Sequence, residues 1–220
     1  MKTNTRRRIL EAACRLFAAG GYRNTTIAGI CRAAEANIAA VNYYFGNKEH
    51  LYEAAWEHAE AAANEKYGII DPGASPAQYL REHIRRIVLM IFDEGPGGCF
   101  PRLVRKDINM EGELIERLFT RFILPRIRRL EAAVSAILGL PLDSIEVHRA
   151  ASHIHSMCVF LNIGSRARQR IFAGKTPDSA KVELLIRSLQ EFAEGGIRRI
   201  ANTLKKAGAG GGPGKPGHNR

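Results

Sequence analysis

Residues 24–51 read NTTIAGICRAAEANIAAVNYYFGNKEHL, and this segment predicts two short helices joined by a tight turn. Thr26 is a good N-cap for the first helix, because its hydroxyl can accept a hydrogen bond from a free backbone N–H. Apolar residues then recur on one helical face at Ile27, Ile30, Cys31 and Ala34. Asn37 can cap the second short helix, which is expected to run to about Tyr44 and to be followed at once by a long helix.

The second short helix has an unusual outer face. Val41 and Phe45 are apolar and are expected to point inward, whereas the outward positions are short or flat and uncharged: Ile38, Ala39, Ala40, Asn42 and Tyr43. A solvated helix would normally carry Lys and Glu at such positions. A helix that lies in the major groove of DNA needs short side chains and few carboxylates. The segment therefore predicts a helix-turn-helix that reads DNA.

Several short segments in and around this stretch form a distinctive pattern in fixed order. They are Arg8–Ala13 (RILEAA), Leu16–Ala18 (LFA), Gly21-Tyr22, Thr25–Ile27 (TTI), Val41–Glu49 (VNYYFGNKE) and Leu51. In these residues the chain resembles the DNA-binding domain of the TetR/AcrR family of bacterial transcriptional regulators. The resemblance implies that Thr26, Tyr43, Tyr44 and Lys48 contact phosphates. It also implies that Asn37, Ile38, Ala39 and Asn42 face the base edges.

One position departs from the family pattern. The family usually has Gly in the turn between the two short helices, where this chain has Glu35. If the turn requires a positive φ, a glutamate there costs on the order of 1 kcal/mol relative to glycine.

Charge is distributed unevenly along the chain of 220 residues, whose formal net charge is +11. Residues 1–48 hold eight Lys and Arg against two Glu, a net charge of +6, whereas residues 49–75 hold one Lys against six acidic residues, a net charge of −5. A basic excess on the DNA-reading segment is typical of a module that binds a polyanion. Composition alone fits a solvated basic end, or a basic protein that binds DNA without sequence preference, equally well.

The rest of the chain reads as helix with no convincing strand, which predicts an all-α protein. Helices are expected over about 4–19, 47–66, 76–94, 112–138, 143–172 and 178–207, with Pro125 kinking or ending the helix over 112–138. We expect a helix-turn-helix domain over 1–48, a connecting helix and linker over 49–75, a helical effector-binding and dimerisation domain over 76–207, and a disordered Gly/Pro-rich tail over 208–220.

No run of about 18 apolar residues and no signal-peptide pattern occur, so a cytoplasmic protein without a membrane partner is expected.

The helices over 143–172 and 178–207 carry more apolar surface than one domain core should cover. The stripe in 178–207 runs from Val182 to Leu204, and the helix over 143–172 has a second face with His148, Ser152, His155, Val159 and Asn162. The family resemblance implies that these helices pair with a second copy of the chain. One helix-turn-helix reads few base pairs, whereas a twofold dimer reads two half-sites of a palindromic operator. Val159, Leu189 and Ile197 are the predicted interface residues.

The C-terminal part resembles the CecR-like effector domain of the same family. The matching residues are Arg102–Arg105 (RLVR), Ile123–Pro125 (ILP) and Leu138–Pro141 (LGLP). This resemblance implies a regulator that responds to a small-molecule effector, whose identity the sequence leaves open.

No catalytic set, metal site or cofactor loop is found in the sequence. The four cysteines form no CxxC pair, and only Cys99, in a Gly/Pro-rich stretch, is expected to be accessible and open to a sensing role. His148 and His155 share a helical face but lack a carboxylate to complete a metal site, which favours interface or pocket histidines. Arg126, Arg128 and Arg129 fit either a solvated helix face or the neutralisation of an anionic ligand.

We therefore predict a homodimeric DNA-binding transcriptional regulator without a cofactor, acting as a repressor that a small molecule releases from its operator. The mechanism follows from linkage, because a ligand that favours the wrong spacing of the two readers must weaken DNA binding. The alternatives are an activator, a non-specific basic DNA-binding protein and a small all-α enzyme.

Overall fold

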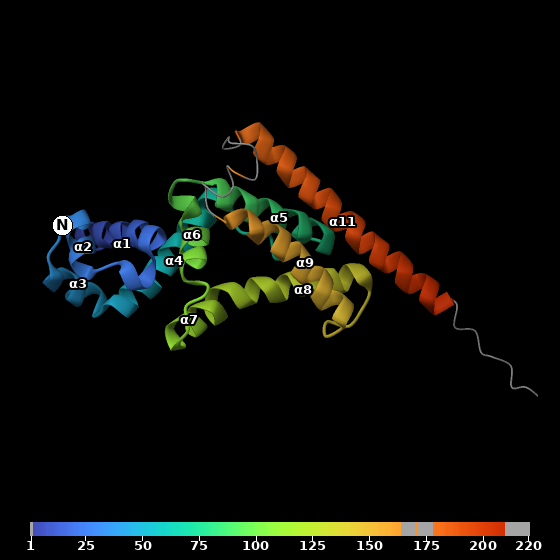
Figure 1. Ribbon diagram of the computed structural model, residues 1–220, viewed down its shortest axis with the longest axis horizontal. Helices are drawn as coiled ribbons and strands as arrows, with labels where there is room; N and C mark the ends of the chain where they lie inside the picture. Colours follow the sequence, from blue (N-terminus) through green and yellow to red (C-terminus); the bar gives the residue numbers. More distant parts are fainter. Residues whose placement is uncertain (1, 164–169, 171–177, 210–220) are drawn as a thin grey trace, which may run out of the picture.

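The computed structural model describes residues 2–163, 170 and 178–209, and every regular element in these residues is a helix (Figure 1). The all-α prediction is therefore confirmed. The helices α1, α2 and α3 lie at one end of the molecule, and the long helix α11 lies at the other end (Figure 1).

The N-terminal half follows the expected pattern closely. Its helices are α1 (Lys2–Asn24), α2 (Ile27–Ala34), α3 (Ile38–Phe45) and α4 (Lys48–Tyr67). Helix α1 extends past the predicted end at residue 19, but it is kinked at Gly21, whose φ of 79° and ψ of 172° are not helical. A positive φ is readily adopted by glycine, which lacks a Cβ.

The C-terminal half contains six α-helices and three shorter helical turns in its described residues. They are α5 (Pro76–Phe92), η1 (Pro96–Gly98), α6 (Cys99–Asp107), α7 (Glu113–Leu118), the π-helical turn η2 (Phe119–Ile123), α8 (Leu124–Leu138), α9 (Ile145–Val159), η3 (Phe160–Asn162) and α11 (Ser179–Ala209).

Three elements differ from the sequence-based expectations. Helix α6 was not predicted, because its segment follows a Gly/Pro-rich stretch and contains Pro101. Pro101 lies in the first turn of α6, where the missing N–H needs no helical partner. Helix α9 ends at Val159, well before residue 172, and residues 164–169 lie outside the described part of the chain. Gly208 and Ala209 still belong to α11, and the rest of the predicted tail lies outside the described residues.

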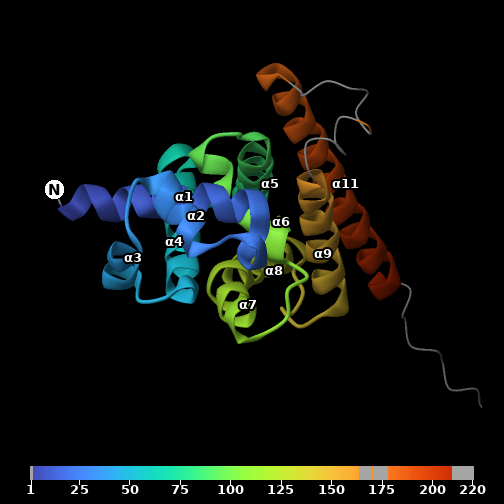
Figure 2. The same ribbon diagram turned by 60° about the vertical axis from the view of Figure 1, so that its left-hand side comes forward.

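Two apolar clusters form the core. The first contains residues of α1 to α4, including the fully buried Tyr52 and Trp56, together with Phe100 and Leu103 of α6 and Phe122 of η2. The second joins α5, α8, α9 and α11. Helix α11 lies beside α9 and also packs on α5 (Figures 1 and 2). Helix α6 therefore shares a core with the N-terminal helices, so a displacement of α6 is transmitted to them through packed side chains.

A row of ion pairs joins α4 to the helices that follow α6. Arg117 pairs with Glu49 and, at 2.9 Å, with Glu53. Arg121 pairs with Glu57 at 2.6 Å, and Arg126 pairs with Glu60 at 2.6 Å. The acidic excess of residues 49–75 is thus largely matched inside the molecule by arginines of the C-terminal half. We call these contacts the α4 ion-pair row.

Candidate nucleic-acid interface

Side-chain caps define the starts of the three helices around the predicted reader. Thr26 Oγ1 accepts a hydrogen bond from the N–H of Gly29 at 3.1 Å, and Asn37 Oδ1 accepts one from the N–H of Ala40 at 2.8 Å. Asn47 caps α4 in the same way, accepting from the N–H of His50 at 2.8 Å. The predicted caps at Thr26 and Asn37 are confirmed. The cap uses only the carbonyl oxygen of Asn37, so its amide nitrogen can still donate to DNA.

The turn between α2 and α3 requires the conformation that favours glycine. Glu35 ends α2 with a φ of 48° and a ψ of 50°, and among the described residues no other non-glycine residue has a positive φ. Arg8 of α1 holds this turn: its Nη2 donates to the backbone carbonyl of Glu35 at 3.2 Å, and its Nη1 lies 3.4 Å from the carboxylate. The strain expected at Glu35 is therefore present.

Helix α3 exposes a short, uncharged outer face. Val41 and Phe45 are buried beneath it, as expected. Ile38 and Tyr43 are 54% and 73% exposed, and Asn37, Ala39 and Asn42 are also exposed. Ala40, expected to point outward, is half-buried and packs against the core. The four residues expected to face base edges thus lie together at the start and on the outer face of α3.

The residues expected to contact phosphates flank this face. Thr26 and Tyr43 are exposed, whereas Tyr44 and Lys48 are half-buried. The Tyr43 and Tyr44 rings meet edge to face, with centroids 5.0 Å apart. The ammonium group of Lys48 lies 4.5 Å from the centroid of the Tyr22 ring, a cation–π contact that orients it. Burial lowers the pKa of Lys48, and the nearby Asp107 opposes this shift.

Asp107, which was not singled out from the sequence, connects the reader to α6. It is buried, and it accepts hydrogen bonds from the N–H of Tyr22 at 3.1 Å and from the hydroxyl of Tyr52. A Cβ at Gly21 would stand 3.0 Å from Asp107 Oδ1, so glycine also allows this close approach. No sequence motif marks Asp107, because its partners are distant in the chain.

The three predicted interface residues differ in exposure. Val159 and Leu189 are half-buried, whereas Ile197 is 4% exposed and belongs to the second core cluster of its own chain. Large apolar side chains elsewhere on α11 are exposed, namely Leu184 at 62% and Phe192 at 76%.

The accessible position expected for Cys99 is wrong. Its side chain is buried at the start of α6, and its Sγ donates to the backbone carbonyl of Cys14 at 3.4 Å. His148 Nδ1 lies 2.8 Å from the carboxylate of Glu131 on α8. Within residues 2–163, 170 and 178–209, no three His, Cys, Asp or Glu side chains are grouped as metal ligands.

None of the described helices is both long and apolar enough to cross a membrane.

Together, a capped helix-turn-helix, an exposed uncharged reading helix and the net charge of +6 over residues 1–48 define a DNA-binding transcriptional regulator. The family model of "Bacterial regulatory proteins, tetR family" matches residues 9–55. The model of the "HTH-type transcriptional dual regulator CecR, C-terminal domain" matches residues 76–197. The chain belongs to the TetR family of transcriptional regulators and carries a CecR-type C-terminal domain. Regulators of this family are not enzymes, in agreement with the sequence-based expectation.

Similar proteins agree with this membership. The chain is 26% identical over 207 residues to the HTH-type transcriptional repressor NicS of Pseudomonas putida, covering 89% of this chain and 93% of NicS. It is 35% identical over 81 residues to the HTH-type transcriptional regulator AcrR of Shigella flexneri, covering 36% of this chain and 37% of AcrR. The crystal structure of AibR in complex with isovaleryl coenzyme A and operator DNA has the same fold. Its TM-score is 0.64 at 20% identity, over 86% of this chain and 97% of that one.

Proposed function

We propose that this regulator is a homodimeric repressor that binds a palindromic operator and is released by a small-molecule effector. The proposal rests on the outer face of α3, whose side chains are exposed, uncharged and mostly short. Such a face can lie against base edges without placing a carboxylate near phosphates.

Base reading in this proposal is divided between methyl groups and one amide. Ile38 and Ala39 offer methyl contacts to thymine, and Asn42 can bond adenine through its amide. Asn37 faces the same groove. No Arg or Gln lies on this face to select guanine. The half-sites should therefore contain A·T pairs at their centres.

Phosphate binding is assigned to Thr26, Tyr43, Tyr44 and Lys48, which flank the reading face. Lys48 stands at the first turn of α4, where the partial positive charge of the helix start adds to that of its ammonium group.

A second copy of the chain is proposed to cover the outer faces of α9 and α11. On α11, Leu184, Ser188 and Phe192 follow one another at four-residue spacing, and a Cβ at Gly195 or Gly196 would meet no atom within 4 Å. On α9 and η3, Ser152, Ser156 and Phe160 repeat the pattern. Small and apolar residues let two helix pairs approach closely. We keep Val159 and Leu189 at the edge of this interface and assign Ile197 to the core of its own domain.

The domain roles remain as the sequence suggests. Residues 1–48 bind DNA, and residues 49–75 connect this domain to the rest of the chain. Residues 76–207 bind the effector and the partner chain, and residues 208–220 are assigned as a tail. AibR was crystallised with an acyl-coenzyme A and operator DNA, which supports an effector for this chain too, of a type still to be identified.

Selection of bound sequences from random DNA, followed by competition titration, tests this function. We expect a twofold-symmetric site with A·T-rich half-site centres, bound at least about a thousandfold more tightly than unrelated DNA. The rival class, a basic protein that binds without sequence preference, would lose affinity with salt but show no preference in the competition. Selection of half-sites with only G·C centres would contradict the assignment of α3.

A further inference from the structure

A polar cluster, buried at His83 and half-buried at its other members, lies where the α4 ion-pair row ends. It consists of Tyr79, His83 and Arg86 of α5, Arg126 of α8 and His155 of α9, and we call it the Arg126 cluster. The rings of Tyr79 and His83 stack with centroids 5.9 Å apart, and those of His83 and His155 lie 6.0 Å apart. The charge of Arg126 acts on both histidines and on Tyr79. Arg126 is therefore the charge that these three side chains share.

Two histidine nitrogens in the cluster have no partner. His83 is only 4% exposed, and its Nε2 is buried without a hydrogen bond in the described part of the chain. The same holds for Nδ1 of His155. Burial lowers the pKa of both rings, that of His83 to about 3, so both are neutral near pH 7. Buried polar atoms are nearly always bonded, and an orphaned pair marks a place that a ligand or ordered water can complete.

Positive charge exceeds negative charge around the cluster. Glu60, at 2.6 Å, is the only carboxylate among the described residues that pairs with Arg126. Arg86 donates to neutral oxygens, the carbonyl of Gly68 and Oδ1 of Asn64. Burial lowers the pKa of Arg86, and the charge of Arg126 lowers it further. A partly buried guanidinium without a carboxylate partner favours the binding of an anion.

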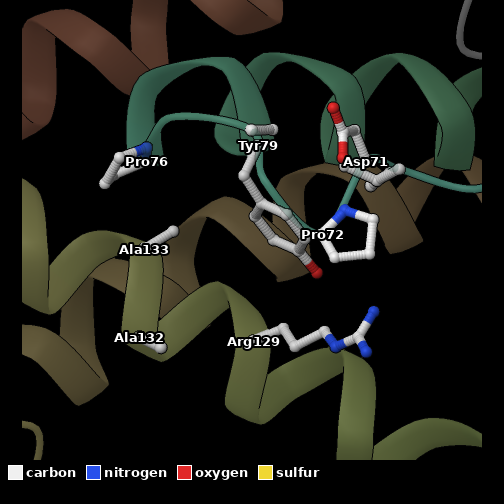
Figure 3. A pocket seen from close by; sticks show the side chains of 9 residues that line it. Asp71, Pro72, Pro76, Tyr79, Arg129, Ala132 and Ala133 are labelled. Atoms are coloured by element: carbon white, nitrogen blue, oxygen red, sulfur yellow. The ribbon is translucent and has the colours of Figure 1, made fainter.

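A cavity of about 300 Å³ opens beside the cluster, between the segment Ile70–Pro76 and α8. The ring of Tyr79 stands in its wall, and the Tyr79 hydroxyl is directed toward the side of Arg129 (Figure 3). Arg129 makes no ion pair or hydrogen bond within the described residues. The apolar part of the lining comes from Pro72 and Ala133, among others (Figure 3). The lining thus combines apolar side chains with one cation, Arg129, and one carboxylate, Asp71, which accepts the N–H of Gly73 at 2.8 Å. Tyr79, a member of the Arg126 cluster, is the residue that the cluster and the cavity share.

We propose that this site binds a small organic acid, with its carboxylate on Arg126 and Arg86, hydrogen bonds from His83 and His155, and its apolar body in the cavity beside Tyr79. The proposal rests on the proposed function as an effector-released repressor and names the chemical class of the effector. A cavity of this size suits a compact ligand at the lower end of the range for small-molecule sites. A planar carboxylate matches the paired N–H groups of a guanidinium.

The same geometry gives the acid a route to the reader. A carboxylate on Arg126 competes with Glu60 for the guanidinium and so opens the last contact of the α4 ion-pair row. Helix α4 begins at Lys48, directly after the reading helix. We therefore expect the acid to favour a position of α4 in which the Arg126–Glu60 pair is open, whereas the operator favours the position in which every pair of the row is closed. Because the two ligands favour different positions of α4, binding of the acid weakens binding of the operator.

Binding can be measured without DNA. Trp56 is the only tryptophan of the chain, and its ring lies 5.4 Å from Phe100, over which Arg126 is placed at 4.3 Å. We would titrate the full-length protein with benzoate, hexanoate and glutarate, and with benzamide and hexanamide as neutral controls, reading Trp56 fluorescence and the Tm. At least one acid should change the fluorescence and raise the Tm, and its amide should not. The Arg126→Gln variant should bind that acid about tenfold more weakly, or weaker still.

Arg128→Gln is the matched control, since Arg128 is an exposed arginine of the same helix without a partner among the described residues. It should bind the acid like the parent protein. Glu60→Gln frees Arg126, so it should tighten acid binding about tenfold and weaken operator binding even without acid. The proposed site is contradicted if no acid changes the Trp56 fluorescence and the Tm of the parent protein more than those of Arg126→Gln, or if the amides change them as much as the acids do. Operator binding that persists in that case leaves the proposed function intact, whereas acid binding without operator binding would refute the function instead.

Discussion

The carboxylate of Asp107, near the end of α6, accepts a hydrogen bond from the backbone N–H of Tyr22, directly after the kink of α1, at 3.1 Å. The same carboxylate accepts the hydroxyl of Tyr52 from α4. Three helices far apart in the chain therefore meet at one buried acceptor. The geometry of the reader depends on the position of α6 through this contact, and Lys48 is held nearby over the ring of Tyr22.

Asp107→Ala should lower the free energy of unfolding by about 2–4 kcal/mol. The substitution leaves the Tyr22 N–H and the Tyr52 hydroxyl without their acceptor, and each unsatisfied buried group costs about 1–3 kcal/mol. Urea unfolding followed by circular dichroism gives the value. Asp143→Ala, at an exposed position, is the control. A loss no larger than that of the control would show that the hydrogen bonds to Asp107 contribute nothing to the free energy of unfolding.

Glu35→Gly should raise the free energy of unfolding by up to about 1 kcal/mol, because glycine adopts a positive φ without a Cβ clash. The exposed ion pair with Arg8 is lost, but it contributes little, and the bond from Arg8 to the carbonyl remains. Glu35→Gln separates the two effects, since it removes the charge and keeps the strain. Equal stabilities for the glycine and glutamine variants would argue against strain at this turn.

Lys48→Ala should weaken binding to all DNA sequences alike and reduce the slope of log K against log salt by about one unit. The reason is that one phosphate contact, and the counterion that it displaces, is lost. Fluorescence anisotropy at several salt concentrations measures the slope. Lys205→Ala, an exposed substitution on α11 far from the reader, should leave it unchanged. An unchanged slope in Lys48→Ala would remove this residue from the phosphate contacts.

Phe192→Asp should produce a folded monomer that binds the palindromic operator weakly, because a charge buried in an interface without a partner costs several kcal/mol. Sedimentation gives the oligomeric state. Val159→Asp and Leu189→Asp should act in the same direction from the edge of the interface, whereas Ile197→Asp should destabilise the monomer itself, since Ile197 is buried in its own chain. A monomeric Phe192→Asp that keeps parental affinity would refute the link between dimerisation and operator binding.

The pH dependence of stability should carry a contribution from His83. Burial, and then the charges of His155, Arg126 and Arg86, lower its pKa to about 3 in the folded state, below the unfolded value of about 6.5. The unfolded state therefore binds more protons between these values, and stability is full above about pH 6.5 and falls as the pH drops toward 3.

Between pH 7 and pH 5 this loss amounts to about 2 kcal/mol. His83→Gln should remove it, which urea unfolding at the two pH values can show. His153→Gln, at an exposed site of α9, is the matched control. A loss between pH 7 and 5 that is the same in His83→Gln as in the parent protein would contradict the assignment.

Features that depend on neighbouring residues could be predicted from the sequence. The caps at Thr26 and Asn37 and the buried positions Val41 and Phe45 follow from short-range spacing. The strained Glu35 followed from comparison with the family pattern. The burial of Cys99 could not be foreseen, because it depends on the packing of α6 against α1. Asp107 and the Arg126 cluster are likewise set by contacts between distant segments, for which a single sequence carries no local signal.

The π-helical turn η2 determines which arginines can reach α4. Arg126 follows Arg121 by five residues, and in an uninterrupted α-helix that step ends about 140° past a full turn, on another side of the helix. The wider π turn, with bonds from residue i to i+5, absorbs the additional residue, and Pro125 favours it because its ring and missing N–H disrupt the α pattern at Arg121. The additional residue thus brings the arginines on both sides of the turn to the face that meets α4. Deletion of one residue within the turn would rotate α7 relative to α8 and separate Arg117 from Glu49 and Glu53. The number of residues in this one irregular turn therefore determines whether the arginines before and after it can pair with α4 at the same time.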